Sequence, residues 1–156
     1  MASARQRPVT PDQRVRDLRK EFRGFEREEP GPERAARLAD FTRVANVERQ
    51  LNMAMQTATM CLEDDPDAPA LLLSAYDDPE EDAETRLDAL ADLRELGRYI
   101  ERPDVAELAQ GRLLEQAHAW VEAGEEGERR YRLRTVQSLT SRELADDIRD
   151  ALDDGP

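Results

Sequence analysis

Residues 51–62, Leu-Asn-Met-Ala-Met-Gln-Thr-Ala-Thr-Met-Cys-Leu, decide how the rest of the sequence is interpreted. None of these residues is charged, although Asp, Glu, Lys and Arg make up 38% of the 156-residue chain. A helix that is apolar or neutral all round is usually buried on most of its sides. We therefore expect this segment to lie at the centre of a helical bundle, or to be covered in part by a second molecule.

The neutral segment continues a helical pattern that begins upstream. Pro30-Gly31-Pro32 stops any preceding helix, and the acidic run 63–67, which contains a proline, ends the pattern. Between these breaks the apolar residues recur every three or four positions, so we predict one helix over residues 33–62. The stripe on its buried face consists of Phe41, Val44, Glu48, Leu51, Met55, Ala58 and Leu62.

The helix before the first break has a clear start. Thr10 and Gln13 have the spacing of a capping box, and Pro11 occupies the first helical position, where proline is favoured. The apolar residues that follow are three or four positions apart, which is the spacing of a packing stripe. They are Val15, Leu18, Phe22 and Phe25.

The second half of the sequence predicts further helices. We expect one or two helical turns at 70–76, a helix from Asp78 as its N-cap to about residue 101, and a helix over 103–123. A second capping box opens a short amphipathic helix over 140–152. We find no internal repeat in the sequence. Together these patterns predict an all-α protein, a small bundle of four to six helices.

Residues 129–137 allow two interpretations. Their side chains alternate with the period of a strand, yet the same residues also fit a helix. We therefore leave open whether the bundle includes a short extended segment here. The organisation that we expect is a flexible N-terminal arm at 1–9, a helical bundle at 10–123, and a C-terminal part at 124–156 that contains a hinge, a basic segment and an amphipathic helix.

Charge is distributed unevenly along the chain, whose formal net charge is −13. Residues 1–27 carry a net charge of +4, residues 63–128 carry −16, and residues 129–142 carry +5. So negative a chain should have no general affinity for nucleic acid or anionic membranes. The basic ends can fold back onto the acidic helices, or they can steer pairing with another copy or another protein.

Residues that usually bind metals or act in catalysis are scarce. His118 is the only histidine. With Glu115 it forms one Glu-x-x-His pair of the kind that di-iron helical bundles use, and we expect both to lie on a solvated helix face. Cys61 is the only cysteine, and its uncharged segment and the acids that follow predict a buried, inert thiol. We expect no enzymatic activity and no cofactor.

These observations favour a non-enzymatic protein-interaction module, such as an adaptor, an assembly factor or a structural subunit. Its partner would be another protein, a second copy of the chain, or both. The alternatives are an acidic mimic of nucleic acid that binds a basic groove and, with less support, a regulator that binds nucleic acid through its basic ends. Lacking a signal peptide or a membrane-length apolar run, the chain is expected to be cytoplasmic. The candidate interaction surface consists of Leu51, Met55, Ala58, Leu62, Arg130, Arg132 and Arg134.

Overall fold

The structure is a computed structural model that describes residues 10–139. These residues form seven α-helices and no strand. The predicted all-α class is therefore confirmed, whereas the predicted count of four to six helices is too low. The predicted arm at 1–9 and the predicted helix at 140–152 lie outside the described residues. No helix within residues 10–139 is long and apolar enough to cross a membrane.

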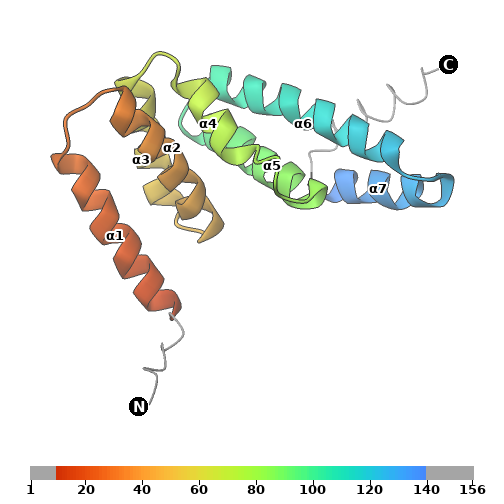
Figure 1. The fold of residues 1–156 in the computed structure, drawn as a ribbon, viewed down its shortest axis with the longest axis horizontal. Coiled ribbons are helices and arrows are strands. Elements are labelled where there is room, and N and C mark those ends of the chain that lie inside the picture. Colours follow the sequence, from red (N-terminus) through yellow and green to blue (C-terminus); the bar gives the residue numbers. More distant parts are fainter. Residues whose placement is uncertain (1–9, 140–156) are drawn as a thin grey trace. The chain divides into compact units, whose positions relative to one another are not determined.

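The chain divides into two compact units, residues 1–68 (unit 1) and residues 69–156 (unit 2), and the division falls inside the predicted 10–123 bundle. Figure 1 labels the helices of both units. Unit 1 contains α1 (Pro11–Arg27), α2 (Pro32–Val47) and α3 (Leu51–Asp64). The helices that follow are α4 (Ala68–Tyr76), which begins at the last residue of unit 1, α5 (Ala83–Tyr99), α6 (Pro103–Ala123) and α7 (Glu126–Leu139).

The capping signals predict the start of α1 but misplace the start of α5. The side chain of Thr10 accepts a hydrogen bond from the Gln13 N–H at 3.2 Å, as the capping box requires. The N-cap of α5 is Asp82, whose carboxylate accepts from the Thr85 N–H at 2.8 Å. The predicted N-cap, Asp78, forms a turn of its own that precedes the helix.

The predicted single helix over 33–62 is wrong, because the chain reverses direction in its middle. α2 ends at Val47, and after a three-residue turn α3 runs back along α2 (Figure 1). In this turn Arg49 has a positive φ of 58°, and the Gln50 N–H donates to the carbonyl of Ala45 at 2.8 Å. These are features of a helix C-terminal motif that usually carries glycine. Because arginine occupies the left-handed position, the sequence contains no visible signal for the turn.

Small side chains let α2 and α3 pack closely. Ala45, Ala54 and Ala58 are fully buried between them. Thr42 and Thr57 are also buried, and their hydroxyl oxygens lie 2.8 Å apart in a hydrogen bond that links the two helices. Each hydroxyl also contacts a backbone carbonyl of its own helix, so burial leaves neither unsatisfied. The neutral segment therefore uses its buried face to bind α2.

A buried arginine joins the three helices of unit 1. Arg34 forms two bonds with the carboxylate of Asp64, at 2.6 and 2.8 Å, and the two side chains are only 9% and 1% exposed. Its guanidinium also donates to the carbonyls of Phe25 and Glu28, at 3.0 and 3.1 Å, where α1 ends. The hydrogen bonds with Asp64 raise the pKa of Arg34 above its ordinary value. The end of α1 is thereby fixed to the α2–α3 hairpin.

Residues 129–137, whose sequence pattern fits either a strand or a helix, are helical. Residues 126–139 form α7, so the alternative of an extended segment at 129–137 is wrong. Val136 is fully buried in the core of unit 2, where it meets residues of α5 and α6, and Leu133 and Leu73 pack against the same core. Helical rather than strand spacing brings Leu133 and Val136 to one face of α7.

A largely buried carboxylate links α4, α5 and α6. Asp77, directly after α4, accepts hydrogen bonds from Arg86 of α5 and Arg112 of α6. Burial raises the pKa of Asp77, but the hydrogen bonds from the two arginines outweigh burial and hold the pKa below its ordinary value. Asp77 is therefore charged at neutral pH, where it connects three helices of unit 2.

Units 1 and 2 contain the same helical hairpin. The α2–α3 and α5–α6 hairpins are related by a shift of 52 residues, because α2 ends at Val47 and α5 at Tyr99. Each turn has three residues with a positive φ at the middle one, 58° at Arg49 and 57° at Glu101. Equivalent positions are buried in both hairpins: Leu38 and Leu90, Phe41 and Leu93, Ala45 and Gly97, Ala54 and Ala106, Cys61 and Leu113.

The prediction that the chain has no internal repeat is therefore wrong. One short signal was present: residues 34–40 (RAARLAD) and 86–92 (RLDALAD) share the pattern Arg-x-x-x-Leu-Ala-Asp. The rest of the two hairpins agrees in which positions are buried rather than in which residues fill them. Packing thus preserves the repeat where the sequence does not.

Candidate functional site

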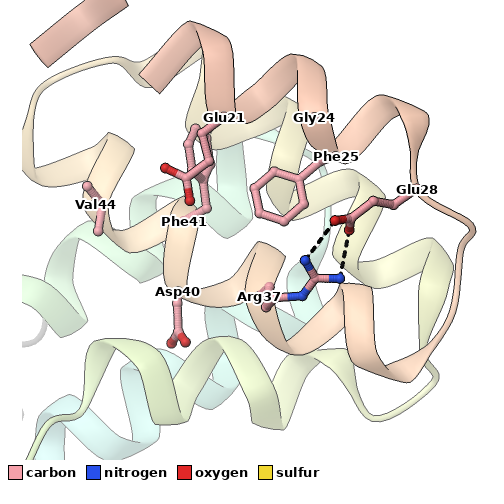
Figure 2. Close-up of a pocket in the computed structure, with 8 residues that line it drawn as sticks. All are labelled: Glu21, Gly24, Phe25, Glu28, Arg37, Asp40, Phe41 and Val44. Carbon is pink, nitrogen blue, oxygen red and sulfur yellow. Dashed lines mark hydrogen bonds and ion pairs between the residues drawn. The ribbon is translucent and has the colours of Figure 1, made fainter. Parts of the chain in front are cut away.

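A cleft of about 440 Å³ lies between α1 and α2 in unit 1. Figure 2 shows one wall formed by α1 and the residue that follows it, and a second wall formed by α2. The lining residues are Glu21, Gly24, Phe25, Glu28, Arg37, Asp40, Phe41 and Val44. The apolar members come from both helices, so the cleft depends on α1 keeping its place beside α2.

Two phenylalanines form the floor of the cleft. The ring centroids of Phe25 and Phe41 are 5.4 Å apart, and the rings meet edge to face at 68°. The guanidinium of Arg37 lies 5.9 Å from the centroid of Phe25 and donates two hydrogen bonds of 2.7 Å to Glu28. In Figure 2 this ion pair lies at one end of the cleft and Val44 at the other. The end at Val44 is the one that lacks an ion pair between the lining residues.

The rim of the cleft is acidic. Glu21 and Asp40 line it, and their side chains form no hydrogen bond or ion pair with another residue in the described part of the chain. Arg37 is the single cation among the lining residues, and Glu28 neutralises it. The cleft therefore suits a group that inserts an apolar side chain and carries positive charge beside it.

An exposed apolar corner adjoins the cleft at Val44. We give this name to Val44, Val47 and Leu51, which are 48%, 64% and 40% exposed at the end of α2 and the start of α3. Within residues 10–138 three further large apolar side chains are exposed, all in unit 2: Tyr99, Leu108 and Tyr131. Single exposed apolar residues are common, but a cluster of them indicates an interaction site.

The repeated hairpin shows that this face can be covered. The position equivalent to Val44 in the α5–α6 hairpin is Leu96, which is only 1% exposed, and the position equivalent to Arg37 is Ala89, which is buried. Two positions of this face, those of Arg37 and Val44, are therefore exposed in α2 although their equivalents in α5 are buried, whereas Phe41 is buried like its equivalent Leu93.

The residues that we predicted from the neutral segment divide between core and surface. Ala58 and Leu62 are buried inside unit 1, Met55 is half-buried, and Leu51 is exposed in the apolar corner. The structure therefore brings one of the four to the candidate site. Sequence reasoning placed Val44 on a buried stripe and gave no role to Val47, because the turn that exposes both was not visible.

The three arginines that we predicted as part of an interaction surface serve different purposes. Arg132 donates to the carbonyl of Trp120 at 2.6 Å, and its guanidinium lies 5.3 Å from the centroid of the Trp120 ring. It thereby secures α7 to α6. Arg130 and Arg134 are exposed, and their side chains form no hydrogen bond or ion pair with another residue in the range 10–139. These arginines belong to unit 2 and Leu51 to unit 1.

The Glu-x-x-His pair on α6 binds other side chains. Glu115 accepts a hydrogen bond from Arg112 at 3.0 Å, and His118 lies 3.6 Å from Glu122. The side chains of Glu115 and His118 are 68% and 33% exposed, as a solvated helix face predicts. Among the described residues no group of three or more His, Cys, Asp or Glu is placed to hold a metal ion.

The predicted burial of Cys61 is confirmed. The side chain is fully buried, and its thiol contacts the carbonyl of Ala35 at 3.2 Å. Burial, with a smaller contribution from Asp64 and Asp65, raises the pKa of Cys61 to about 12. The thiol is therefore protonated at neutral pH and is a poor nucleophile.

No family model matches the chain, and comparisons with curated proteins and with solved structures likewise give no match. The evidence for a function is therefore the surface of the chain itself. On unit 1 that surface consists of the α1–α2 cleft and the apolar corner.

Proposed function

We propose that the chain is a non-enzymatic protein-interaction module, acting as an adaptor, an assembly factor or a structural subunit. Unit 1 binds a segment of a partner protein along the α1–α2 cleft and the apolar corner. The observation that carries this proposal is the contrast between Val44, which is 48% exposed, and Leu96, which is 1% exposed at the equivalent position of the second hairpin.

The chemistry of the cleft limits the kind of partner. The apolar floor of Phe25 and Phe41 suits an apolar side chain, and Val44 extends the apolar surface toward Leu51. The carboxylates at the rim favour lysine or arginine on either side of that side chain. The partner is therefore a protein segment, such as an amphipathic helix, that carries apolar residues flanked by basic ones.

Charge introduced at the apolar corner tests the proposal. We expect Val44→Glu combined with Leu51→Glu to abolish capture of the partner from a lysate of the source organism, because binding would bury both carboxylates without a counter-charge. The matched control is Leu108→Glu in unit 2, since Leu108 and Leu51 are both 40% exposed. Quantitative mass spectrometry of the captured proteins is the measurement.

The comparison has a clear contradictory outcome. If wild type and the Val44→Glu, Leu51→Glu variant capture the same proteins in the same amounts while circular dichroism shows equal helix content, the corner does not bind the partner. Loss of the same proteins from the Leu108→Glu variant would also count against the proposal, because that residue lies in unit 2.

A further inference from the structure

The face of α1 turned away from its apolar stripe carries a regular row of positive charge. Arg16, Lys20, Arg23 and Arg27 stand at intervals of four, three and four residues, so they lie on one side of the helix, and we call them the basic stripe. All four are exposed. The stripe spans twelve residues, which corresponds to about 16 Å along the helix axis. It is distinct from the face of α1 that lines the cleft.

The side chains of the basic stripe are unpaired within the described chain. None of the four side chains forms a hydrogen bond or an ion pair with another residue between 10 and 139. The one cation of α1 that does so is Arg14, which lies 3.5 Å from Glu48. In a chain with 36 acidic and 23 basic side chains, an unpaired row of cations on one helix is an unexpected feature.

An acidic row of the same length lies on α5. Glu84, Asp88, Asp92 and Glu95 stand at intervals of four, four and three residues, and we call them the acidic stripe. It also spans twelve residues, or about 16 Å. Glu84 and Asp88 are exposed, whereas Asp92 and Glu95 are half-buried and already interact with other residues, Glu95 with Arg94 and Arg98. The two stripes therefore match in length and are opposite in charge.

The distribution of charge between the units permits two copies to approach each other. Unit 1 contains 12 basic and 13 acidic side chains, for a net charge of −1, whereas unit 2 has a net charge of −12. The negative charge that would repel a second copy is therefore concentrated in unit 2. When unit 1 of one copy meets unit 2 of another, the nearly neutral unit presents its basic stripe to the acidic one, and the local attraction dominates at short range.

We propose that the chain self-associates through these stripes, with α1 of one copy lying along α5 of a second copy. Exposed ion pairs are individually weak, so the dissociation constant should be roughly tens of micromolar at about 50 mM salt. Raising the salt to about 500 mM should weaken association at least about tenfold.

Charge reversal on both stripes tests the proposal by rescue. Sedimentation velocity of Lys20→Glu with Arg23→Glu should give a monomer, because the basic stripe loses its net positive charge and no longer attracts α5. Glu84→Lys with Asp88→Lys should also give a monomer, because the acidic stripe loses its net negative charge. An equimolar mixture of the two variants should associate again, since the unaltered α1 of one variant can then lie along the unaltered α5 of the other. The matched control, Arg130→Glu with Arg134→Glu, reverses two exposed arginines of α7 and should associate as wild type does.

Three outcomes would overturn the proposal. The first is a wild-type protein that is monomeric at about 100 μM and low salt. The second is a mixture of reversed variants that stays monomeric although circular dichroism shows both to be folded. The third is binding of the wild-type stripe to a short nucleic-acid duplex at physiological salt, lost on Lys20→Glu with Arg23→Glu, in a protein that does not self-associate. None of these depends on the partner of the cleft, because the variants leave its lining residues unchanged.

Discussion

Replacing Asp64 with alanine should lower the free energy of unfolding of unit 1 by about 3 kcal/mol, the lower end of the range for removing one partner of a buried ion pair. The side chain of Asp64 is 1% exposed, and its carboxylate is the counter-charge of Arg34. The lower end applies because Arg34 keeps its hydrogen bonds to the carbonyls of Phe25 and Glu28. Chemical denaturation, with hydrogen exchange at the amides of α2 and α3 to assign the loss to unit 1, is the measurement.

The Arg37–Glu28 pair provides the matched control. Arg37 also donates two hydrogen bonds to one carboxylate, each 2.7 Å long, but the two side chains are 56% and 36% exposed. Glu28→Gln should therefore cost severalfold less stability than Asp64→Ala. Equal losses in the two variants would contradict the view that burial, rather than ion pairing as such, makes Arg34 important. Arg34→Met with Asp64→Leu should cost less than the two single replacements together, because no charge is then left buried.

Replacing Gly97 with alanine should destabilise unit 2 by about 2 kcal/mol, as expected when an atom is forced into a closely packed contact. A Cβ atom at this position would lie 2.7 Å from the backbone nitrogen of Ala106 and 3.1 Å from its Cα. Backbone atoms at the start of α6 cannot move aside as a flexible side chain can. The two helices of the hairpin would have to separate, and thermal denaturation should show a lower midpoint.

Gly111 in α6 is the control for Gly97. It is also a glycine inside a helix, but a Cβ added there meets nothing within 4 Å. Gly111→Ala should therefore raise stability by about 0.5–1 kcal/mol through helix propensity alone. If both replacements stabilised the protein, α5 and α6 would not approach each other as closely at Gly97 as the structure has them.

Much of the helical content could be predicted from the sequence, because each signal is local. Thr10 with Gln13 marks the start of α1, and Pro103 marks the start of α6. Prolines and acidic runs separate the predicted helices. The turn at 48–50 could not be predicted, since Arg49 takes a conformation that usually requires glycine while apolar spacing continues on both sides. One missed turn converts a long helix into a hairpin.

The same turn explains why the candidate site was largely missed. If 33–62 were one straight helix, Val44, Leu51, Met55, Ala58 and Leu62 would share one face, and all would be buried or exposed together. In the hairpin, Ala58 is buried, whereas Val44 and Leu51 are exposed on either side of the turn where the chain reverses. Which of these side chains is exposed depends on how α3 packs against α2. The spacing of apolar residues along one helix does not predict that packing.

Comparison of the two hairpins identifies the candidate site. The hairpin appears twice in this chain, and in the second occurrence Leu96 is buried at the position equivalent to Val44. The first occurrence leaves Val44 open beside a cleft with an acidic rim. The basic stripe on the opposite side of α1 is independent of that cleft, so one helix serves two proposed contacts: a partner protein on one side and a second copy on the other.

Photo-crosslinking from position 44 tests the central claim most directly. A photoreactive amino acid is placed at Val44, and in a separate protein at Leu108, and each is expressed and irradiated in the source organism. We predict that position 44 yields an adduct with one predominant protein other than a second copy of the chain, and that position 108 does not. No adduct at position 44, or the same adducts at both positions, would contradict the claim that the open face of α2 is covered by a partner protein.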